Sequence, residues 1–227
     1  MSGDAIDILT YHSISHGPGP ICIAPETFRQ QMDAMAACGY RGAALCEVVA
    51  WLRGEDRLPG KSLVLTFDDG YSDFADVVLP ELLTRGWTAT VFVPAGKLGG
   101  AADWDARRGR PARRLLSRLT VKDLAQLGVE VAAHGLSHTD LTRLAPQEVR
   151  KEIGGRSGVS KTALAARSRA LPHRMVGPTQ PFGQKSGGTT RLRLAPGWRE
   201  PRRPRICTTC HALKCGIFAI RGCGVLT

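Results

Sequence analysis

The chain has 227 residues, of which 43% are hydrophobic and 22% are charged, and these proportions exclude a wholly disordered, collagen-like or coiled-coil protein. Its formal charge of +11 would ordinarily suggest an anionic partner such as nucleic acid. The charge is unevenly distributed, however. Residues 1–154 carry 17 Lys and Arg against 19 Asp and Glu, whereas residues 155–227 carry 14 basic residues and one acid. The suggestion of an anionic partner therefore applies only to the last third of the chain.

Alternating strands and helices are predicted through residue 154. Apolar periodicity locates the elements, and a glycine directly follows several of the predicted helices, as is typical of helix ends. In chain order we expect a strand at 6–11, helices at 25–38 and 44–53, a strand at 62–67, a helix at 73–85, a strand at 88–93, a helix at 120–127, a strand at 129–133 and a helix at 146–153.

This alternation determines the expected fold class. Residues 62–67 form a near-continuous apolar run, which is typical of a parallel strand covered on both faces. Strands separated by helices favour right-handed βαβ units, and therefore an α/β fold with an open doubly wound sheet or a (β/α) barrel. In both architectures ligands bind at the carboxyl ends of the strands. Residues 98–119 form an Arg-rich insertion of the length expected for an active-site loop or lid.

Polar side chains follow three of the predicted strands. His12 comes after the first, Asp68 and Asp69 come after the second, and His134 and His138 come after the fourth. A carboxylate and two imidazoles form a suitable ligand set for Zn²⁺ or a similar divalent ion, with a position left open for water. A second carboxylate beside the first is then suited to act as the general base.

Each of these motifs also has a simpler interpretation. An Asp-Asp-Gly sequence after a strand is most often a turn or a helix cap. A histidine pair in a loop is usually solvated or hydrogen-bonded, and Tyr11 with His12 is on its own more typical of a core tyrosine beside a hydrogen-bonded histidine. The HExxH protease motif is absent, because position 135 is Gly. The catalytic interpretation depends on the observation that all of these residues follow strands of the same alternating strand–helix pattern.

The chain resembles the polysaccharide deacetylase family (NodB homology domain, carbohydrate esterase family 4) in two motifs, Thr-Phe-Asp-Asp-Gly at 66–70 and His-Gly-Leu-Ser-His at 134–138. Residues 8–15 and 90–94 extend the similarity, which covers about residues 6–154. The resemblance implies a distorted, incomplete (β/α) barrel. It also implies metal-dependent hydrolysis that removes N-acetyl groups from an amino-sugar polysaccharide or oligosaccharide.

The resemblance also implies a role for each site residue. Asp69, His134 and His138 match the family's metal ligands, with Zn²⁺ as the expected ion and Co²⁺ or Ni²⁺ as alternatives. Asp68 matches the general base that activates water for attack on the acetamide carbonyl. Most family members take the general acid from a C-terminal Leu-x-His motif that this sequence does not reproduce. A permuted subgroup active on poly-N-acetylglucosamine uses a histidine in an N-terminal Tyr-His segment, which makes His12 the candidate acid.

A third family motif is matched only in part, by Gln-Pro-Phe-Gly at 180–183. If this match is real, the backbone N–H of Phe182 is expected to help stabilise the oxyanion. The alternative is a chance match, because the surrounding sequence is rich in Pro and Gly. A different residue stands at the position of the motif's Arg or Tyr. Whether a side chain of this motif orients Asp68 is therefore left open.

The boundary at about residue 155 divides a deacetylase-like domain, 1–155, from an atypical tail, 156–227, rich in Arg, Pro, Gly and Cys. One hypothesis is a change of reading frame near residues 154–160, which translation of the coding DNA in the other frames would reveal. A second is haem or zinc binding through Cys207, Cys210 and His211, which have the CxxCH spacing. A third is a basic arm for nucleic acid or an acidic polymer, with only Trp198 nearby for stacking.

Several further expectations follow from the sequence. The substrate partner is an N-acetylated amino-sugar polymer or oligomer, and no clear nucleic-acid partner is indicated. Neither a signal peptide nor a membrane-spanning run is recognised, so a cytoplasmic location is expected. Oligomeric state is not indicated. The alternative functions are an inactive or truncated deacetylase-like protein that only binds metal, and a binding protein that acts through its basic tail.

Overall fold

The structure is a computed structural model that describes residues 6–154 and 207–208. Its strands are β1 (Asp7–Tyr11), β2 (Ser13–Ile14), β3 (Cys22–Ile23), β4 (Arg41–Ala43), β5 (Ser62–Phe67), β6 (Thr90–Val93), β7 (Glu130–Ala133) and β8 (Cys207–Thr208). Its helices are α1 (Pro25–Ala37), α2 (Leu45–Leu52), α3 (Leu79–Thr84), α4 (Asp103–Ala106), α5 (Arg118–Gln126) and α6 (Pro146–Gly154), with a π-helical turn η1 (Phe74–Val78) and a 3₁₀ turn η2 (Leu141–Arg143).

The predicted α/β class is confirmed by a parallel sheet with helices between its strands. Among the described residues the sheet has the order β7-β6-β5-β1-β8, and β4 pairs with the first half of β5. Every pairing in it is parallel. The arrangement agrees with a NodB-type (β/α) barrel, although the strands of the described part do not close into a complete barrel.

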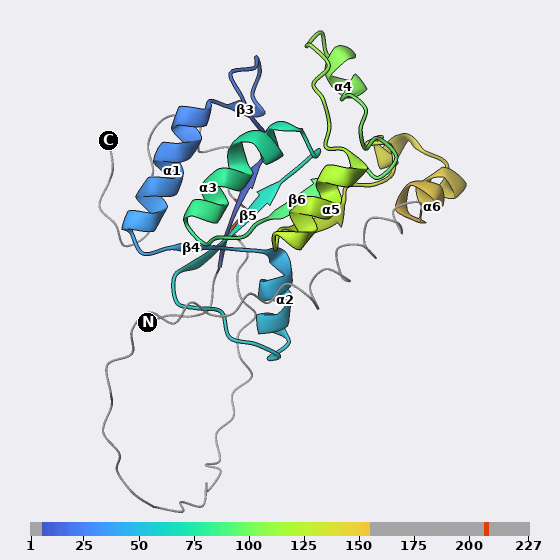
Figure 1. The fold of residues 1–227 in the computed structure, drawn as a ribbon. Helices are drawn as coiled ribbons and strands as arrows, with labels where there is room; N and C mark the ends of the chain where they lie inside the picture. Colours follow the sequence, from blue (N-terminus) through green and yellow to red (C-terminus); the bar gives the residue numbers. More distant parts are fainter. Residues whose placement is uncertain (1–5, 155–206, 209–227) are drawn as a thin grey trace, which may run out of the picture.

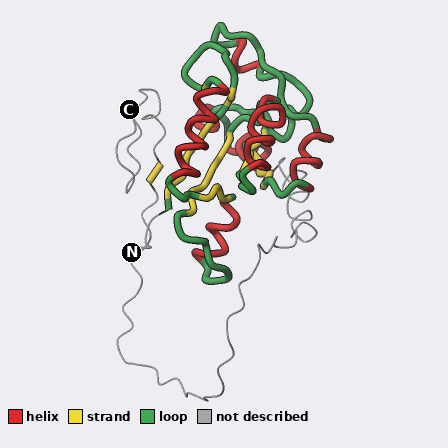
Figure 2. Tube along the Cα trace, turned by 60° about the vertical axis from the view of Figure 1, so that its left-hand side comes forward, coloured by secondary structure: helices red, strands yellow, loops and turns green. Residues whose placement is uncertain are grey.

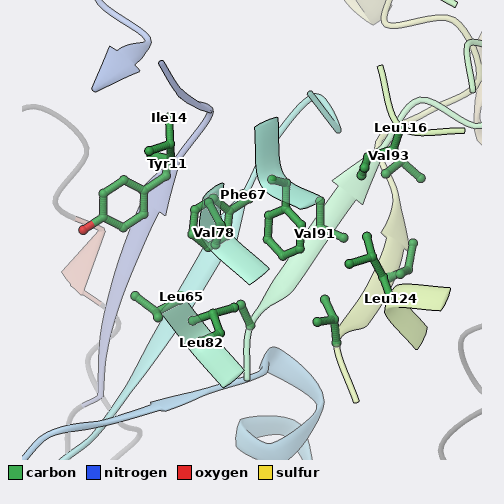
Figure 3. Packing of buried hydrophobic residues seen from close by; sticks show 14 of the residues in the cluster. Tyr11, Ile14, Leu65, Phe67, Val78, Leu82, Val91, Val93, Leu116 and Leu124 are labelled. Carbon is green, nitrogen blue, oxygen red and sulfur yellow. The ribbon is translucent and has the colours of Figure 1, made fainter. Parts of the chain in front are cut away.

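Helices α1, α3 and α5 lie over one face of the sheet (Figure 1). Alternate residues of β5 point to this face, where Leu63, Leu65 and Phe67 join one buried apolar cluster, as the two-residue repeat of a strand requires. The helices contribute the other side of the cluster, and Figure 3 shows the side chains of Leu82 and Leu124 directed at the strands. This burial fixes the positions of the strands, and therefore the positions of their carboxyl ends.

Helix α2 packs on the opposite face of the sheet. Val64, which points away from the apolar cluster of Leu63, Leu65 and Phe67, is buried together with Val48 of α2. The first turn of α2 is tied to the sheet by polar contacts, since the amide of Leu45 donates to Thr90 Oγ1 (2.8 Å) and the amide of Cys46 donates to Glu130 Oε2 (2.9 Å). These side chains satisfy amides that a helix start leaves without a partner.

Long loops gather beyond the carboxyl ends of the strands, at the top of the views in Figures 1 and 2. The 98–119 insertion is one of these loops, and backbone hydrogen bonds attach it to the segment that follows β5. The amide of Leu116 donates to the carbonyl of Gly70 (2.8 Å), and the amide of Ser72 donates to the carbonyl of Arg114 (3.0 Å). The insertion is therefore an anchored loop at this edge of the sheet.

Several details differ from the sequence-based expectations. The short elements β2, β3 and α4 were not predicted. The sequence also predicted no strand at β4 or at β8. β8 lies in the segment expected to be irregular and pairs with β1. The helix expected at 73–85 begins with the wider turn η1, because Pro80 has no amide hydrogen to donate to the carbonyl of Asp76. Within the described residues, no helix has both the length and the apolar character needed to cross a membrane.

Candidate active site

Asp68 and Asp69 lie directly beyond the buried end of β5. The amide of Asp68 donates to the carbonyl of Tyr11 (2.9 Å), which continues the pairing of β5 with β1 by one residue. The chain then turns sharply, with φ of +70° at Asp69 and +65° at Gly70. A Cβ at Gly70 would lie 2.8 Å from Val93 Cγ1, so glycine is required both by the left-handed backbone and by the close approach to β6.

His134 and His138 lie on the loop that follows β7. The amide of His134 donates to the carbonyl of Val93 (2.8 Å), and the carbonyls of Gly135 and Leu136 accept from the amides of Ala95 and Gly96 at 3.0 and 2.7 Å. The loop is therefore fastened to the segment that leaves β6. His138 has φ of +61°, a left-handed conformation that is uncommon for a residue other than glycine.

The structure brings the three predicted metal ligands together. Asp69 Oδ1 lies 2.8 Å from His138 Nε2 and 3.4 Å from His134 Nε2. One potential ligand atom from each of these residues lies within 4.8 Å of the other two. The Asp69 side chain is 5% exposed, whereas those of His134 and His138 are 36% and 23% exposed. One buried carboxylate and two partly exposed imidazoles form a donor set that fits a divalent transition-metal ion.

The electrostatics of the cluster separate its two carboxyl groups. Burial opposes ionisation of Asp69, but hydrogen bonds from His134 and His138 outweigh it and hold the Asp69 pKa well below its usual range. Burial instead raises the pKa of Asp68, against the opposing effect of the nearby histidines. The hydrogen bond to Asp69 raises the pKa of His134. Adjacent carboxyl groups with opposite shifts are common where they have different tasks.

His12 faces Asp68 across the site. Its Nε2 lies 4.0 Å from Asp68 Oδ2, and both side chains are about a quarter exposed, at 27% and 23%. The preceding residue, Tyr11, is held in the core, where its hydroxyl donates to Gln31 Oε1 (3.0 Å) and its ring stacks on Phe67. Tyr11 therefore has the structural role that the sequence suggested for it, and it fixes the strand end that carries His12.

The remaining site prediction, Phe182, lies outside the described residues. The same holds for Cys210, His211 and Trp198 of the tail hypotheses. The role of Phe182 at the oxyanion therefore remains a prediction.

Glu152 is a residue near the site that the sequence analysis did not single out. It lies on α6 and accepts hydrogen bonds from the amides of Leu136 (3.0 Å) and Ser137 (2.9 Å) and from the Ser137 hydroxyl (2.6 Å). These contacts fix the segment between His134 and His138. The pattern of α6 predicts a helix, but nothing in it identifies which polar residue reaches back to the loop.

Replacing Glu152 with Ala is expected to lower the affinity for Co²⁺ by about 10-fold or more, as removal of a group that orients metal ligands commonly does. Glu152→Gln should retain part of this affinity, because its amide oxygen still accepts from the loop. The exposed Glu148 of the same helix offers a matched control, Glu148→Ala. The three affinities are measured by Co²⁺ titration, monitored by visible absorption. Equal affinities for Glu152→Ala and Glu148→Ala would contradict the role of Glu152 in orienting the loop of His134 and His138.

Trp104 and Tyr71 are also near the site and were not identified in the sequence. The Trp104 ring stacks on that of His138 with centroids 4.1 Å apart, and its Nε1 donates to the Tyr71 hydroxyl (3.2 Å). The signal available beforehand was a lone tryptophan inside an Arg-rich insertion already expected to border the site.

Comparison with known families and proteins gives a consistent result. The family model described as polysaccharide deacetylase matches residues 55–173. The Bacillus subtilis (strain 168) protein YxkH, whose name assigns it to the polysaccharide deacetylases, is 28% identical over 148 residues, which cover 65% of this chain and 48% of YxkH. The poly-β-1,6-N-acetyl-D-glucosamine N-deacetylase of Escherichia coli (strain K12) is 35% identical over 74 residues, which cover 33% of this chain and 11% of that enzyme. The chitooligosaccharide deacetylase of Bradyrhizobium sp. (strain ANU 289) is 30% identical over 118 residues, covering 52% and 46% of the two chains.

A solved structure shows the same fold. IcaB from Ammonifex degensii superposes with a TM-score of 0.57 at 24% identity, over 72% of this chain and 71% of that one. The match with YxkH spans about half of that relative's length, and the match with the Escherichia coli enzyme spans about a tenth.

Proposed function

The chain belongs to the polysaccharide deacetylase family, and we propose on this premise that it is a hydrolase that removes N-acetyl groups from an amino-sugar polymer or oligomer. The relatives named as deacetylases act on poly-β-1,6-N-acetyl-D-glucosamine and on chitooligosaccharide. Both names describe chains of N-acetylated amino sugars, which is why we assign this substrate class. We place the activity in residues 1–155.

The observation that carries the proposal is the convergence of Asp69, His134 and His138 beside Asp68 and His12. These five side chains follow three different strands, and they meet at the carboxyl edge of the parallel sheet, where ligands of such folds bind. Core packing alone does not require two carboxyl groups and three histidines to gather at one partly exposed place.

In the proposed reaction Asp69, His134 and His138 hold a divalent cation, for which we name Zn²⁺ first and Co²⁺ or Ni²⁺ as alternatives. Such an ion, when bound, supplies a Lewis acid that activates water and polarises the amide carbonyl. Asp68 accepts the proton of the attacking water at its carboxylate. His12 donates a proton from its ring to the amide nitrogen as the C–N bond breaks, so that acetate and a free amine leave.

Two features of the described residues support this division of roles. Asp68 Oδ2 and His12 Nε2 are 4.0 Å apart, so both can contact one small reacting group such as an acetamide. Each side chain is also partly exposed to solvent. Asp69, by contrast, is almost fully buried between both histidines, which suits a ligand and not a group that must exchange protons with substrate.

Replacing His12 with Ala is expected to lower kcat on an N-acetylated oligomer by about 100-fold or more, the usual contribution of a general acid. The loss should be much smaller with p-nitrophenyl acetate, because that leaving group departs without being protonated. His16→Ala is the matched control, since His16 is largely exposed and pairs only with Glu26 among the described residues. An equal loss on both substrates would argue against His12 as the acid.

Acetate release tests the substrate class. The full chain with added Zn²⁺ or Co²⁺ is incubated with β-1,4- and β-1,6-linked N-acetylglucosamine oligomers and with a simple non-sugar acetamide. Faster release from either oligomer series than from the acetamide is expected. Release from the acetamide alone would contradict the sugar assignment, and metal binding without any release would support the alternative of an inactive deacetylase-like protein.

A further inference from the structure

We propose that Trp104 is a positioning residue that fixes the orientation of the His138 imidazole. In this proposal the 98–119 insertion, which carries Trp104, forms a fixed side of the site. This inference rests on the proposed function, because it takes His138 as a metal ligand. The indole and imidazole rings are stacked, with centroids 4.1 Å apart and an interplanar angle of 26°. On its Nε2 side the same imidazole meets Asp69 Oδ1 at 2.8 Å. Its orientation is therefore set by two neighbours.

His138 depends on such neighbours because its own backbone does little to orient it. It lies in an irregular loop with φ of +61°, outside the regular elements whose geometry restricts side-chain direction. A ring on such a loop can rotate unless something packs against its face. Trp104 is buried, with 4% of its surface exposed, and supplies that face.

Trp104 is itself held rigidly by a chain of polar contacts behind the indole. Its Nε1 donates to the Tyr71 hydroxyl (3.2 Å), which in turn donates to Asp105 Oδ2 (3.2 Å). The Asp105 carboxylate is fully buried and accepts from Arg113 Nε (3.1 Å) and Nη2 (2.8 Å). The Arg113 guanidinium also lies 4.0 Å from the centre of the Tyr71 ring. The other carboxylate oxygen, Asp105 Oδ1, accepts no hydrogen bond from the described residues and forms an ion pair with Arg110 Nη2 (3.4 Å). The hydrogen bonds through Tyr71 and Arg113 restrict movement of the indole from behind.

The backbone links this network to the other side of the metal site. The segment 70–72, which directly follows Asp69, is fastened to the insertion by the bond from Leu116 to Gly70 and the bond from Ser72 to Arg114. Within the insertion, the amide of Ala102 donates to the carbonyl of Arg113 (2.8 Å). The insertion thus contacts both the turn that carries Asp69 and the ring of His138. Because the insertion is bonded at both places, it forms a fixed side of the site. Its residue Trp104 aligns the proposed ligand His138 with the proposed ligand Asp69.

The test compares Trp104→Leu with Trp104→Phe, two residues of similar size of which only phenylalanine offers a ring face to His138. Co²⁺ alone is the probe, and its dissociation constant is measured by visible absorption on the full chain. We expect Trp104→Leu to bind Co²⁺ about 10-fold or more weakly than the unmodified chain, as loss of an outer orienting group does. Trp104→Phe should remain within about threefold of the unmodified chain, because it keeps the stack.

Leu124→Ala controls for general loss of stability. Leu124 of α5 is fully buried in the apolar cluster of the core, so its truncation is expected to lower the melting temperature. The Co²⁺ affinity of this variant should stay unchanged. Equal Co²⁺ affinities for Trp104→Leu and Trp104→Phe, or an equal weakening in Leu124→Ala, would overturn the inference. If the proposed metal site itself were wrong, the result would be a different one. Asp69→Asn would then bind Co²⁺ with the same affinity as the unmodified chain.

Discussion

Asp68→Asn is expected to reduce kcat for acetate release by about 100- to 10,000-fold, the range that a positioned general base contributes. Asparagine has nearly the same shape as aspartate but cannot accept the proton of the attacking water. The backbone bond from residue 68 to Tyr11 is retained in the variant, so the strand end should keep its position. Co²⁺ affinity should remain within a few fold, because Asp68 is not among the grouped ligand atoms.

The control for removing a carboxylate from this part of the chain is Asp76→Asn, because Asp76 is exposed on the neighbouring turn η1. It should have the activity of the unmodified chain. A loss of Co²⁺ binding in Asp68→Asn that equals its loss of activity would mean that Asp68 is a ligand and not the base.

Asp69→Asn is expected to have the opposite signature, with Co²⁺ affinity reduced by more than about 100-fold, beyond what loss of an outer orienting group costs. The reason lies in the geometry, since Asp69 is the buried member of the cluster and the acceptor for both histidines. Acetate release at low metal concentration should fall to background. Because the base is intact, excess metal should restore part of the activity, whereas it should restore none in Asp68→Asn.

Asp103→Asn is a suitable comparison for this second variant. Asp103 is also an aspartate and lies within the insertion, but it pairs with Lys97 at the surface, and its replacement should leave metal binding unchanged. If excess metal rescued Asp68→Asn and failed to rescue Asp69→Asn, the two roles would have been assigned the wrong way round.

The elements that the sequence predicted most closely are those with a strong local signal. β5 has the predicted bounds, Ser62–Phe67, because an apolar run ends abruptly at two aspartates. β4 was not predicted because Arg41, Gly42 and Ala43 have no periodicity, and the strand exists through its pairing with β5. A Cβ at Gly42 would lie 3.0 Å from both Leu65 and Trp87 side-chain atoms, a constraint that appears only once the chain is folded.

The same distinction applies to the site. His12, Asp68, Asp69, His134 and His138 could be named because each follows a predicted strand, and the parallel sheet brings strand ends to one edge. Glu152 and Trp104 could not be named, because each reaches the loop of His138 from a distant segment. Helical periodicity predicts α6 and insertion length predicts a loop, but neither pattern specifies which side chain contacts the loop of His138.

The most direct test of the central claim is the yield of acetate and free amine from N-acetylglucosamine oligomers, measured on the full chain after metal removal by a chelator and again after Zn²⁺ or Co²⁺ is returned. We predict no products from the metal-free protein and equal amounts of acetate and amine once metal is restored. Asp68→Asn and His134→Ala should release neither at a comparable rate. Product formation that is unaffected by chelation or by these two substitutions would contradict the assigned site.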